Sequence, residues 1–180
     1  MSWTAKPSAT TEIPRRAAPY VDAARAARWE REIIPCYATR LGALMPILHE
    51  IQHAERCIPY QAMVEIAAFL KISAAEVLDT VSFYEEYSLE KRGACVIGIC
   101  QSIACEVCGH QKLVDRVRER LGIGPHETTP DGKFTLLALE CLGSCDTAPV
   151  ALMNEKLHEG LTVARLDQLI DEAANKPDQH

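Results

Sequence analysis

Two close cysteine pairs, separated by thirty-five residues, constrain this chain more than any other feature of its sequence. The first pair is Cys100 and Cys105, in a C-x4-C arrangement, and the second is Cys141 and Cys145, in a C-x3-C arrangement. Four cysteine thiolates that a fold brings to one place are the usual ligands of an iron–sulfur cluster. The pattern therefore predicts a metal or cluster site, and it requires a fold in which the two pairs meet.

A further cysteine, Cys108, leaves a second ligand set open. Cys100, Cys105 and Cys108 match the spacing of the plant-type ferredoxin loop, with Cys141 or Cys145 as a distant fourth ligand. That loop belongs to a mostly stranded fold, whereas a helix is expected soon after Cys108. We therefore favour a ligand set in which Cys108 is a free thiol near the site and the two pairs supply Cys100, Cys105, Cys141 and Cys145.

The cysteines also have three other possible uses. Four thiolates can hold zinc in an interaction module, although both loops are wider than the usual C-x2-C zinc knuckle. Cys105 and Cys108 could form a redox dithiol, but the two flanking pairs would then have no purpose. The remaining cysteines are expected to be buried thiols that pack as small apolar side chains, namely Cys36, Cys57 and Cys95.

Length and composition exclude several classes of protein. The 180 residues, 48% of them apolar, allow one sizeable core or two small ones. The net charge of −6 gives no basic surface for nucleic acid. No apolar run approaches the roughly 20 residues of a membrane helix, and no hydrophobic segment of an export signal follows Arg15 and Arg16. Eight cysteines in such a chain indicate reduced thiols and a cytosolic protein.

The first half of the chain has the apolar spacing of helices. Residues 1–18, rich in Ser, Thr, Pro and Ala, are expected to form a flexible tail, and residues 19–92 a helical N-terminal domain. Ser73 and Glu76 form a capping box, which marks the start of a helix. The expected helices cover residues 20 to 34, residues 41 to 52 with Pro46 near the start or at a kink, residues 59 to 70, and residues 73 to 84.

The pattern changes after Gly93, and residues 93–180 are expected to form a second domain with the order β-α-β-β-β-α. If the first two strands lie side by side in parallel, joined by the helix, the two cysteine loops leave the same edge of the sheet. The expected strands are 94–99, 134–139, 149–153 and 156–158, and the expected helices are 113–121 and the segment after Thr162.

His49, Glu50 and His53 provide an alternative of a different class. They fit H-E-x-x-H, in which two histidines bind zinc and the glutamate activates water, as in a zinc-binding hydrolase. A possible third ligand, Glu76, is already explained by the capping box. We favour exposed polar residues opposite the apolar stripe of the helix. Since no Gly-rich phosphate loop follows a strand, we expect no nucleotide or flavin site, and an electron carrier of this kind needs a partner.

Longer motifs accompany the cysteines: Leu44-Met-Pro-Ile-Leu-His49 with Gln52, Val81-Ser-Phe-Tyr84, Thr128-Thr-Pro-Asp-Gly-Lys-Phe-Thr135, and Glu140-Cys-Leu-Gly-Ser-Cys-Asp146 followed by Ala148-Pro149. With these motifs, residues 43 to 173 resemble the E-type subunit of bacterial NADH-quinone oxidoreductase, the thioredoxin-like [2Fe-2S] component of the peripheral arm of respiratory complex I. The resemblance implies an α+β protein, in which a small helical bundle precedes a thioredoxin-like [2Fe-2S] domain. It also implies that Cys100, Cys105, Cys141 and Cys145 hold one [2Fe-2S] cluster.

The resemblance further implies a place in an assembly. The cluster would exchange an electron with the FMN of a partner flavoprotein, similar to the F-type subunit of that oxidoreductase, which also binds NADH. Other peripheral-arm subunits would be partners too, on the cytoplasmic side of the inner membrane and without membrane insertion. The chain would then be an oxidoreductase subunit with no complete active site of its own. Diaphorase subunits of NAD-linked hydrogenases and formate dehydrogenases remain an alternative, and Phe83, Tyr84 and Tyr87 are equally explained as partner contacts or as ordinary aromatics.

Residues next to the cysteines are expected to set the potential of the cluster. Glycines let amide N–H groups approach its sulfurs, whereas carboxylates close in space oppose the addition of an electron. We expect a low potential for this reason. The flanking glycines are Gly98, Gly109 and Gly143, and the carboxylates are Glu106, Glu140 and Asp146.

Overall fold

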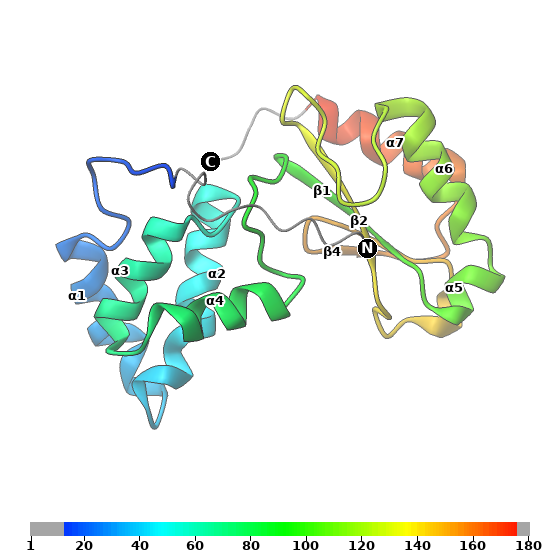
Figure 1. Cartoon of the computed structure of the whole chain (residues 1–180). Coiled ribbons are helices and arrows are strands. Elements are labelled where there is room, and N and C mark those ends of the chain that lie inside the picture. Colours follow the sequence, from blue (N-terminus) through cyan, green and yellow to red (C-terminus); the bar gives the residue numbers. More distant parts are fainter. Residues whose placement is uncertain (1–12, 176–180) are drawn as a thin grey trace. The chain divides into compact units, whose positions relative to one another are not determined.

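The computed structural model describes residues 13–175, which divide into two compact units between Lys91 and Arg92. Within these residues, the first unit contains helices and short turns, and the second contains a sheet with helices (Figure 1). The predicted α+β class, with helices first and a mixed sheet after them, is confirmed.

The helical unit follows the expected order of helices. Asp22 caps the first helix by accepting a hydrogen bond from the Arg25 N–H, and Ser73 with Glu76 makes both bonds of the predicted capping box. Pro46 lies in the first turn of its helix, where its missing N–H removes no helical hydrogen bond. The helices are α1 (Ala23–Glu32), α2 (Leu44–Glu55), α3 (Tyr60–Leu70) and α4 (Ala74–Phe83), with 3-10 turns η2 (Ile34–Cys36) and η3 (Arg40–Ala43).

Glu50 holds α1 to α2, and it is not the exposed polar residue that the sequence predicted. Its carboxylate accepts hydrogen bonds from the Trp29 indole at 2.7 Å and from the Arg28 guanidinium at 2.5 Å, and Arg25 lies 3.2 Å away. The Trp29 side chain is fully buried in the core of this unit, so its N–H needs a protein acceptor. Glu50 is therefore half-buried and serves the packing of Trp29.

Replacement of Glu50 by alanine is expected to destabilise the protein by about 2–3 kcal/mol, because a buried indole N–H loses its acceptor. Denaturant unfolding followed by tryptophan fluorescence measures this difference. Glu32→Ala is the matched control, since Glu32 is half exposed, pairs with Arg31 and should contribute within about 0.5 kcal/mol. Equal losses in the two variants would contradict the role given to Glu50.

The second unit is built on a four-stranded sheet with the strand order β2-β1-β3-β4. The first two strands are parallel, with Cys95 opposite Phe134 and Cys100 opposite Leu139, and β3 is antiparallel to both β1 and β4. The strands are β1 (Cys95–Cys100), β2 (Phe134–Leu139), β3 (Ala151–Met153) and β4 (Lys156–His158). All four expected strands are therefore present, and the first two are parallel neighbours as predicted.

Two long helices lie side by side against one face of this sheet (Figure 1). They are α6 (His110–Leu121), which connects β1 to β2, and α7 (Val163–Ala174), which Thr162 caps as predicted. Arg116 and Arg120 of α6 pair with Asp167 of α7 at 3.0 and 3.1 Å. The core between helices and sheet includes Ile97, Ile99, Leu113, Val117, Leu136 and Leu166.

A short helix, α5 (Ile103–Val107), lies in the first cysteine loop and was not expected from the sequence. Five residues are too few to show a helical repeat. Its exposed apolar side chains, Ile103 and Val107, also do not mark a core-facing stripe. The helix nevertheless fixes where Cys105 lies.

Of the three cysteines predicted to be buried, only Cys95 is fully so. Cys57 is half-buried, and burial raises the pKa of its thiol. Cys36 is exposed, because the chain leaves α1 through the η2 turn at Pro35, and its Sγ lies 3.4 Å from the carbonyl oxygen of Glu32. The prediction of a buried thiol is thus wrong for Cys36 and only partly right for Cys57.

The flexible tail predicted for residues 1–18 lies mostly outside the described residues, which begin at 13. Within the described part, Arg16 contacts the helical unit. Its guanidinium lies 3.4 Å from the Tyr20 ring centroid and 3.0 Å from the Glu55 carboxylate, and its backbone N–H donates to Gln61 at 2.9 Å. Arg16 is therefore tied to α2 and α3 by several contacts.

Candidate metal centre

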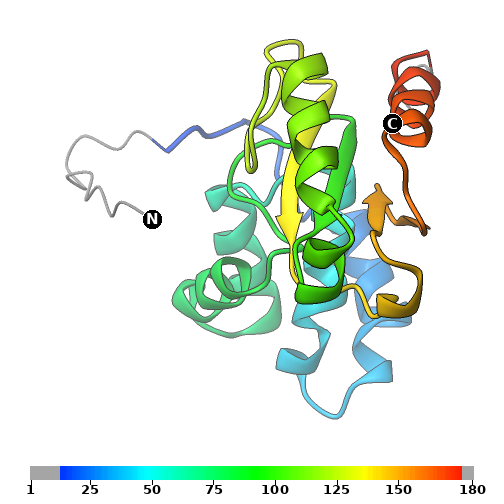
Figure 2. The same ribbon diagram turned by 90° about the vertical axis from the view of Figure 1, so that its right-hand side faces the viewer.

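The parallel pairing of β1 and β2 brings the two cysteine loops to one edge of the sheet. Cys100 is the last residue of β1, and Cys141 follows the end of β2 by two positions. Cys105 lies on α5 and Cys145 begins the short helix η4 (Cys145–Thr147), and these two helices contact each other. Figure 2 shows α5 and the loop with η4 at the same end of the sheet.

The four thiols form two pairs. The Sγ atoms of Cys141 and Cys145 are 3.5 Å apart, close to the edge of about 3.8 Å of a tetrahedral metal–thiolate site with bonds near 2.3 Å. The thiols of Cys100 and Cys105 are hydrogen-bonded to each other, and each of these residues is only 1% exposed. Within each pair, the two thiols thus interact directly with each other.

Two thiol pairs at one edge of the sheet can supply two ligands to each of two irons. Across residues 13–175, no three His, Cys, Asp or Glu side chains surround a point where a single ion could bind. A structural zinc site needs four ligands about one point, whereas a [2Fe-2S] cluster takes two protein ligands on each iron, with sulfides completing each tetrahedron. Two separate thiol pairs at one edge therefore match the donor set of a diiron cluster.

Backbone and hydroxyl donors point at two of the sulfurs. The Gly143 N–H donates to the Cys141 sulfur, and this bond, with smaller contributions from Cys145 and Ser102, lowers the pKa of that thiol. Gly143 has a φ of +82°, a conformation that glycine adopts without strain. The Val150 N–H donates to the Cys105 sulfur, although burial is the stronger effect and raises the pKa of Cys105. Such donors stabilise negative charge on cluster sulfurs.

The two pairs differ in their exposure to solvent. Cys100 and Cys105 are buried with Val150, and Leu142 and Ala148 pack against them. Cys141 and Cys145 are exposed. A group held by all four thiols would consequently have one side against the protein core and the other side toward the surface.

Cys108 lies at the end of α5 and is exposed. The thiols that raise the pKa of Cys105 are those of Cys100 and Cys145. Cys145, in turn, has a raised pKa chiefly because of its hydrogen bond and charge interaction with Cys141, and Cys100 adds to the shift. These contacts connect Cys100, Cys105, Cys141 and Cys145 with one another.

Two of the three expected carboxylates act on the thiols. The negative charge of Glu140 acts to raise the pKa of Cys141, against the hydrogen bonds that lower it, and the Glu140 carboxylate accepts a hydrogen bond from Gln101 at 3.2 Å. The charge of Asp146 contributes to the raised pKa of Cys145. Both are thus close enough to influence charge at this edge of the sheet. Glu106 is exposed on α5.

The H-E-x-x-H motif does not have the geometry of a hydrolase. Glu50 is engaged by Trp29 and Arg28, so it is not free to activate water. The rings of His49 and His53 are 6.4 Å apart, and His49 packs on Tyr87 at 5.1 Å. The absence of a single-ion site noted above for residues 13–175 applies to this motif as well. The arrangement of the motif is explained by packing.

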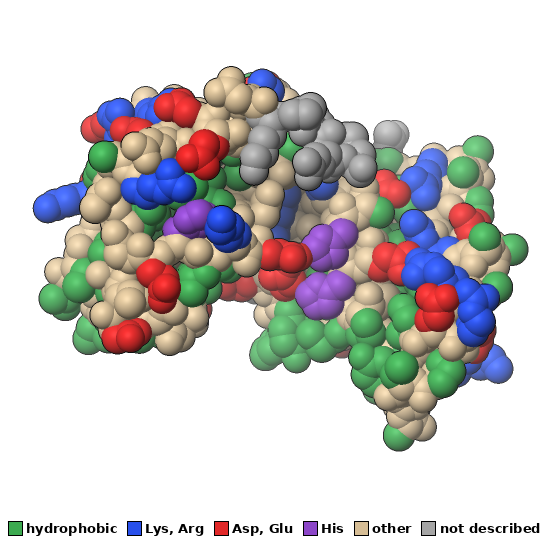
Figure 3. All heavy atoms as spheres, turned by 180° about the vertical axis from the view of Figure 1, so that it is seen from behind, with side chains coloured by type: hydrophobic (Ala, Val, Ile, Leu, Met, Phe, Trp, Pro, Cys, Tyr) green, Lys and Arg blue, Asp and Glu red, His purple; other side chains and the backbone are tan. Residues whose placement is uncertain are grey.

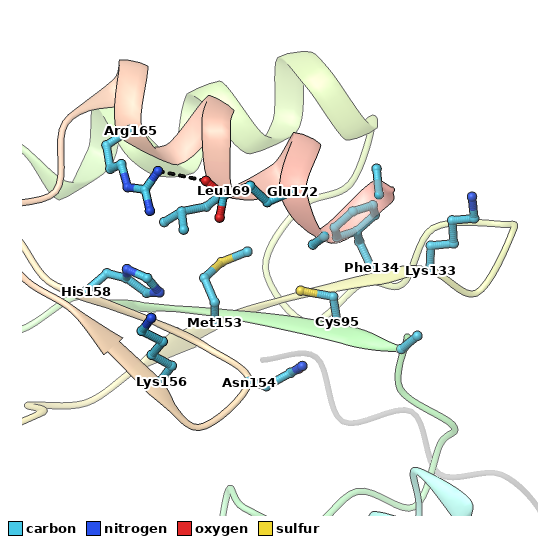
Figure 4. Close-up of a pocket in the computed structure, with 13 residues that line it drawn as sticks. Cys95, Lys133, Phe134, Met153, Asn154, Lys156, His158, Arg165, Leu169 and Glu172 are labelled. Atoms are coloured by element: carbon cyan, nitrogen blue, oxygen red, sulfur yellow. Dashed lines mark hydrogen bonds and ion pairs between the residues drawn. The ribbon is translucent and has the colours of Figure 1, made fainter. Parts of the chain in front are cut away.

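A cavity of about 390 Å³ lies between the sheet and α7 (Figure 4). Cys95 and Met153 from the sheet and Leu169 from α7 line its apolar part. At the other end, Arg165 and Glu172 form an ion pair at 2.9 Å. None of the cysteines of the two pairs lines this cavity, so the cavity is separate from the candidate metal centre.

Comparison with known proteins assigns the chain to a family. A family model described as thioredoxin-like [2Fe-2S] ferredoxin matches residues 30–174. The chain belongs to this family. The thioredoxin-like ferredoxins bind a [2Fe-2S] cluster, as their name states, and the family predicted from the sequence motifs is thereby confirmed.

Several curated members of the thioredoxin-like ferredoxin family are similar over most of their length. NADH-quinone oxidoreductase subunit 2 of Thermus thermophilus is 39% identical over 132 residues, which are 73% of each chain. An E-type subunit of the NADH-quinone oxidoreductase of Rhizobium meliloti is 36% identical over 75% of this chain and 80% of its own. The E-type subunit of the Aquifex aeolicus enzyme is 32% identical over 78% of this chain and 88% of its own.

Solved structures of an NAD+-reducing [NiFe]-hydrogenase share the fold of this thioredoxin-like ferredoxin. The air-oxidised form matches with a TM-score of 0.64 and 25% identity over 73% of this chain, and the H2-reduced form with a TM-score of 0.65 over 78%. The match covers 23% and 24% of the hydrogenase chains, so this chain spans about a quarter of their length.

The surface of the thioredoxin-like ferredoxin carries charge of both signs. Figure 3 shows acidic and basic side chains interspersed over the face that it draws. Across residues 13–175, the helices are too short or too polar to span a lipid bilayer.

Proposed function

We propose that this chain is an electron-transfer subunit of an NADH:quinone oxidoreductase. In this proposal, Cys100, Cys105, Cys141 and Cys145 hold one [2Fe-2S] cluster, which exchanges an electron with the FMN of a partner flavoprotein. The observation that carries the proposal is the meeting of two thiol pairs at one sheet edge in a chain of this family. The curated relatives named as subunits of that oxidoreductase support the choice of complex.

The cluster supplies a site that accepts and returns one electron. The residues of this chain would bind it and set how easily it takes the electron. Amide N–H groups of Gly143 and Val150 donate to ligand sulfurs and favour added negative charge, whereas the carboxylates of Glu140 and Asp146 oppose it. Burial of the Cys100 and Cys105 side keeps water from that half of the site.

NADH and FMN are assigned to the partner flavoprotein, which we take to be similar to the F-type subunit of the oxidoreductase. On this proposal the chain has no complete active site, and it works in the cytoplasm as a peripheral part of a complex on the inner membrane. A second assembly, the diaphorase part of an NAD-linked hydrogenase or formate dehydrogenase, is supported by the structural likeness to the NAD+-reducing [NiFe]-hydrogenase.

Native purification through a tag on this chain tests the proposal. We expect a brown protein with two irons and two sulfides per chain, together with a flavoprotein that oxidises NADH and subunits of a quinone reductase. Co-purification of hydrogenase or formate dehydrogenase subunits would instead select the second assembly. A colourless chain that contains zinc, or a brown chain without any flavoprotein, would refute the proposed role.

The double variant Glu140→Gln and Asp146→Asn is expected to raise the midpoint potential, because removal of two negative charges makes reduction easier. The rise should be about 20–50 mV, the order expected for exposed charges in a high dielectric. A redox titration followed by electron paramagnetic resonance measures it. Glu119→Gln on α6, which removes a charge paired with Arg116, is the control. An unchanged midpoint potential in the double variant would show that these carboxylates do not influence the potential of the cluster.

A further inference from the structure

Two apolar side chains on α5 are unusually exposed. Ile103 and Val107 are 78% and 83% exposed, whereas the next most exposed large apolar side chain described in this unit, Leu157, is 37% exposed. The two residues are four positions apart, so they lie on the same face of the helix. Cys105 lies between them in sequence and is only 1% exposed. The helix therefore buries its thiol and presents an aliphatic pair to solvent.

Folding of this unit does not explain the aliphatic pair. The buried cores of this unit form without Ile103 and Val107. Exposed apolar side chains that cluster beside a functional group commonly mark a surface that another molecule covers. Polar residues at both positions would leave the packing of Cys105 unchanged, so a role at the surface is the better explanation.

The position of the pair beside the thiols indicates what covers it. α5 carries Cys105 and contacts η4, which begins at Cys145, and both Cys141 and Cys145 are exposed at this edge. Electron tunnelling weakens steeply with distance, so an electron that enters or leaves a cluster here must pass to a redox centre close to this edge. The redox partner, rather than an unrelated protein, is the molecule that must cover it.

The charges around the pair define the chemistry of the partner surface. Glu106 lies on α5 between the two aliphatic residues, and Glu140 and Asp146 flank the exposed thiols. All three carboxylates are exposed, and they give this edge an acidic border. Charge complementarity then requires Lys or Arg side chains on the partner, placed around an apolar recess.

We propose that Ile103 and Val107, bordered by Glu106, Glu140 and Asp146, form the docking surface of the partner flavoprotein, here named the α5 surface. The inference rests on the proposed function. It adds which residues of this chain bind the flavoprotein and what kind of flavoprotein surface they contact. The flavoprotein presents an apolar recess with a basic rim, which covers the α5 surface and brings the flavin close to the thiol edge.

The double variant Ile103→Ser and Val107→Ser tests the α5 surface in the full, cluster-loaded chain. The probe is the flavoprotein that co-purifies with the tagged wild-type chain. We expect its affinity to fall about tenfold or more, as at the centre of an interface, while iron, sulfide and the visible spectrum stay unchanged. Leu157→Ser on β4 is the matched control, because it also truncates an exposed aliphatic residue. Equal affinity for wild type and double variant would overturn the proposal.

Charge reversal at Glu106 supplies an independent measurement that holds even if the double variant loses its cluster. Glu106→Lys should weaken flavoprotein binding, and the binding of wild type should weaken further as salt rises from about 50 to about 300 mM. An unchanged affinity of Glu106→Lys for the flavoprotein would overturn the proposed docking role of the α5 surface. So would the finding that the wild-type chain forms dimers and that the Ile103→Ser and Val107→Ser double variant is a monomer. In those cases the proposed function still stands, because it fails only if the wild-type chain lacks the cluster or the flavoprotein.

Discussion

Replacement of Cys145 by serine is expected to remove or strongly perturb the cluster, whereas the same replacement at Cys108 is expected to leave it intact. Cys145 lies 3.5 Å from Cys141 and interacts with Cys100, while Cys108 is an exposed residue at the end of α5. Substitutions of residues that support metal ligands typically weaken metal binding by roughly 10–100-fold, so loss of a ligand should lower the affinity for the cluster at least tenfold. Iron and sulfide per chain, with the visible spectrum, measure the effect.

The two serine variants are matched, since both replace an exposed cysteine within the same edge of one unit. A chain that keeps its cluster without Cys145 and loses it without Cys108 would select the plant-type ligand set, with Cys141 as the fourth ligand. Loss in both variants would mean that the integrity of the loops, rather than ligand identity, controls the cluster.

Alanine at Gly93 is expected to destabilise the sheet-containing unit by about 2–4 kcal/mol, in the range of severe overpacking. A Cβ at this buried position would lie 2.6 Å from the carbonyl carbon and 2.7 Å from the nitrogen of Phe134. These are backbone atoms of β2, so the strand itself would have to move. The Gly93 N–H also donates to Thr135 at 2.6 Å, which would be strained by the same movement.

Gly124→Ala is the control for this substitution. The added Cβ would meet the Glu127 carboxylate at 3.5 Å, which is an ordinary contact. The free energy of unfolding should therefore change by no more than about 0.5 kcal/mol. Thermal unfolding of both variants, with the iron content of each, measures the difference. If Gly93→Ala unfolds at the wild-type temperature, the close approach of the chain to β2 does not contribute to stability as argued.

The sheet was predictable because its strands are short apolar runs rich in β-branched residues, bounded by turns. The parallel neighbours β1 and β2 followed from the helix between them, since strand-helix-strand units join adjacent parallel strands. This one topological expectation placed Cys100 and Cys141 at the same edge of the sheet.

The failures of prediction have local causes. Helix α5 has no core-facing stripe, because its aliphatic residues point outward and its buried residue is a cysteine. Glu50 was expected to be exposed, because helical spacing places it off the apolar stripe, and the sequence does not show that the buried Trp29 indole needs its carboxylate. Cys36 is exposed because the η2 turn, rather than a helix, follows α1.

The candidate site was predictable in its cysteines and only partly in its hydrogen bonds. Gly143 was expected to bring an N–H toward a sulfur, and it does so at Cys141. The Val150 N–H that reaches Cys105 had no sequence signal, because Val150 lies nine residues beyond Cys141, within an apolar segment. Of the other flanking glycines, Gly98 lies inside β1 against Leu139, and Gly109 precedes α6 as its N-cap with a φ of +89°.

Because β1 and β2 pair residue by residue, the number of residues between the end of β2 and Cys141 determines where the second thiol pair lies. Only Glu140 separates the end of β2 from Cys141, and an inserted residue there would displace the second thiol pair by about 3.3 Å, nearly the length of the Cys141 to Cys145 separation. The turn before β2, around Asp131, lies at the opposite end of the sheet from the thiols, where Gly132 and Lys133 accept hydrogen bonds from Ala94 and Cys95. Any attempt to graft this centre into another scaffold must therefore copy the strand-to-thiol spacing together with the four cysteines.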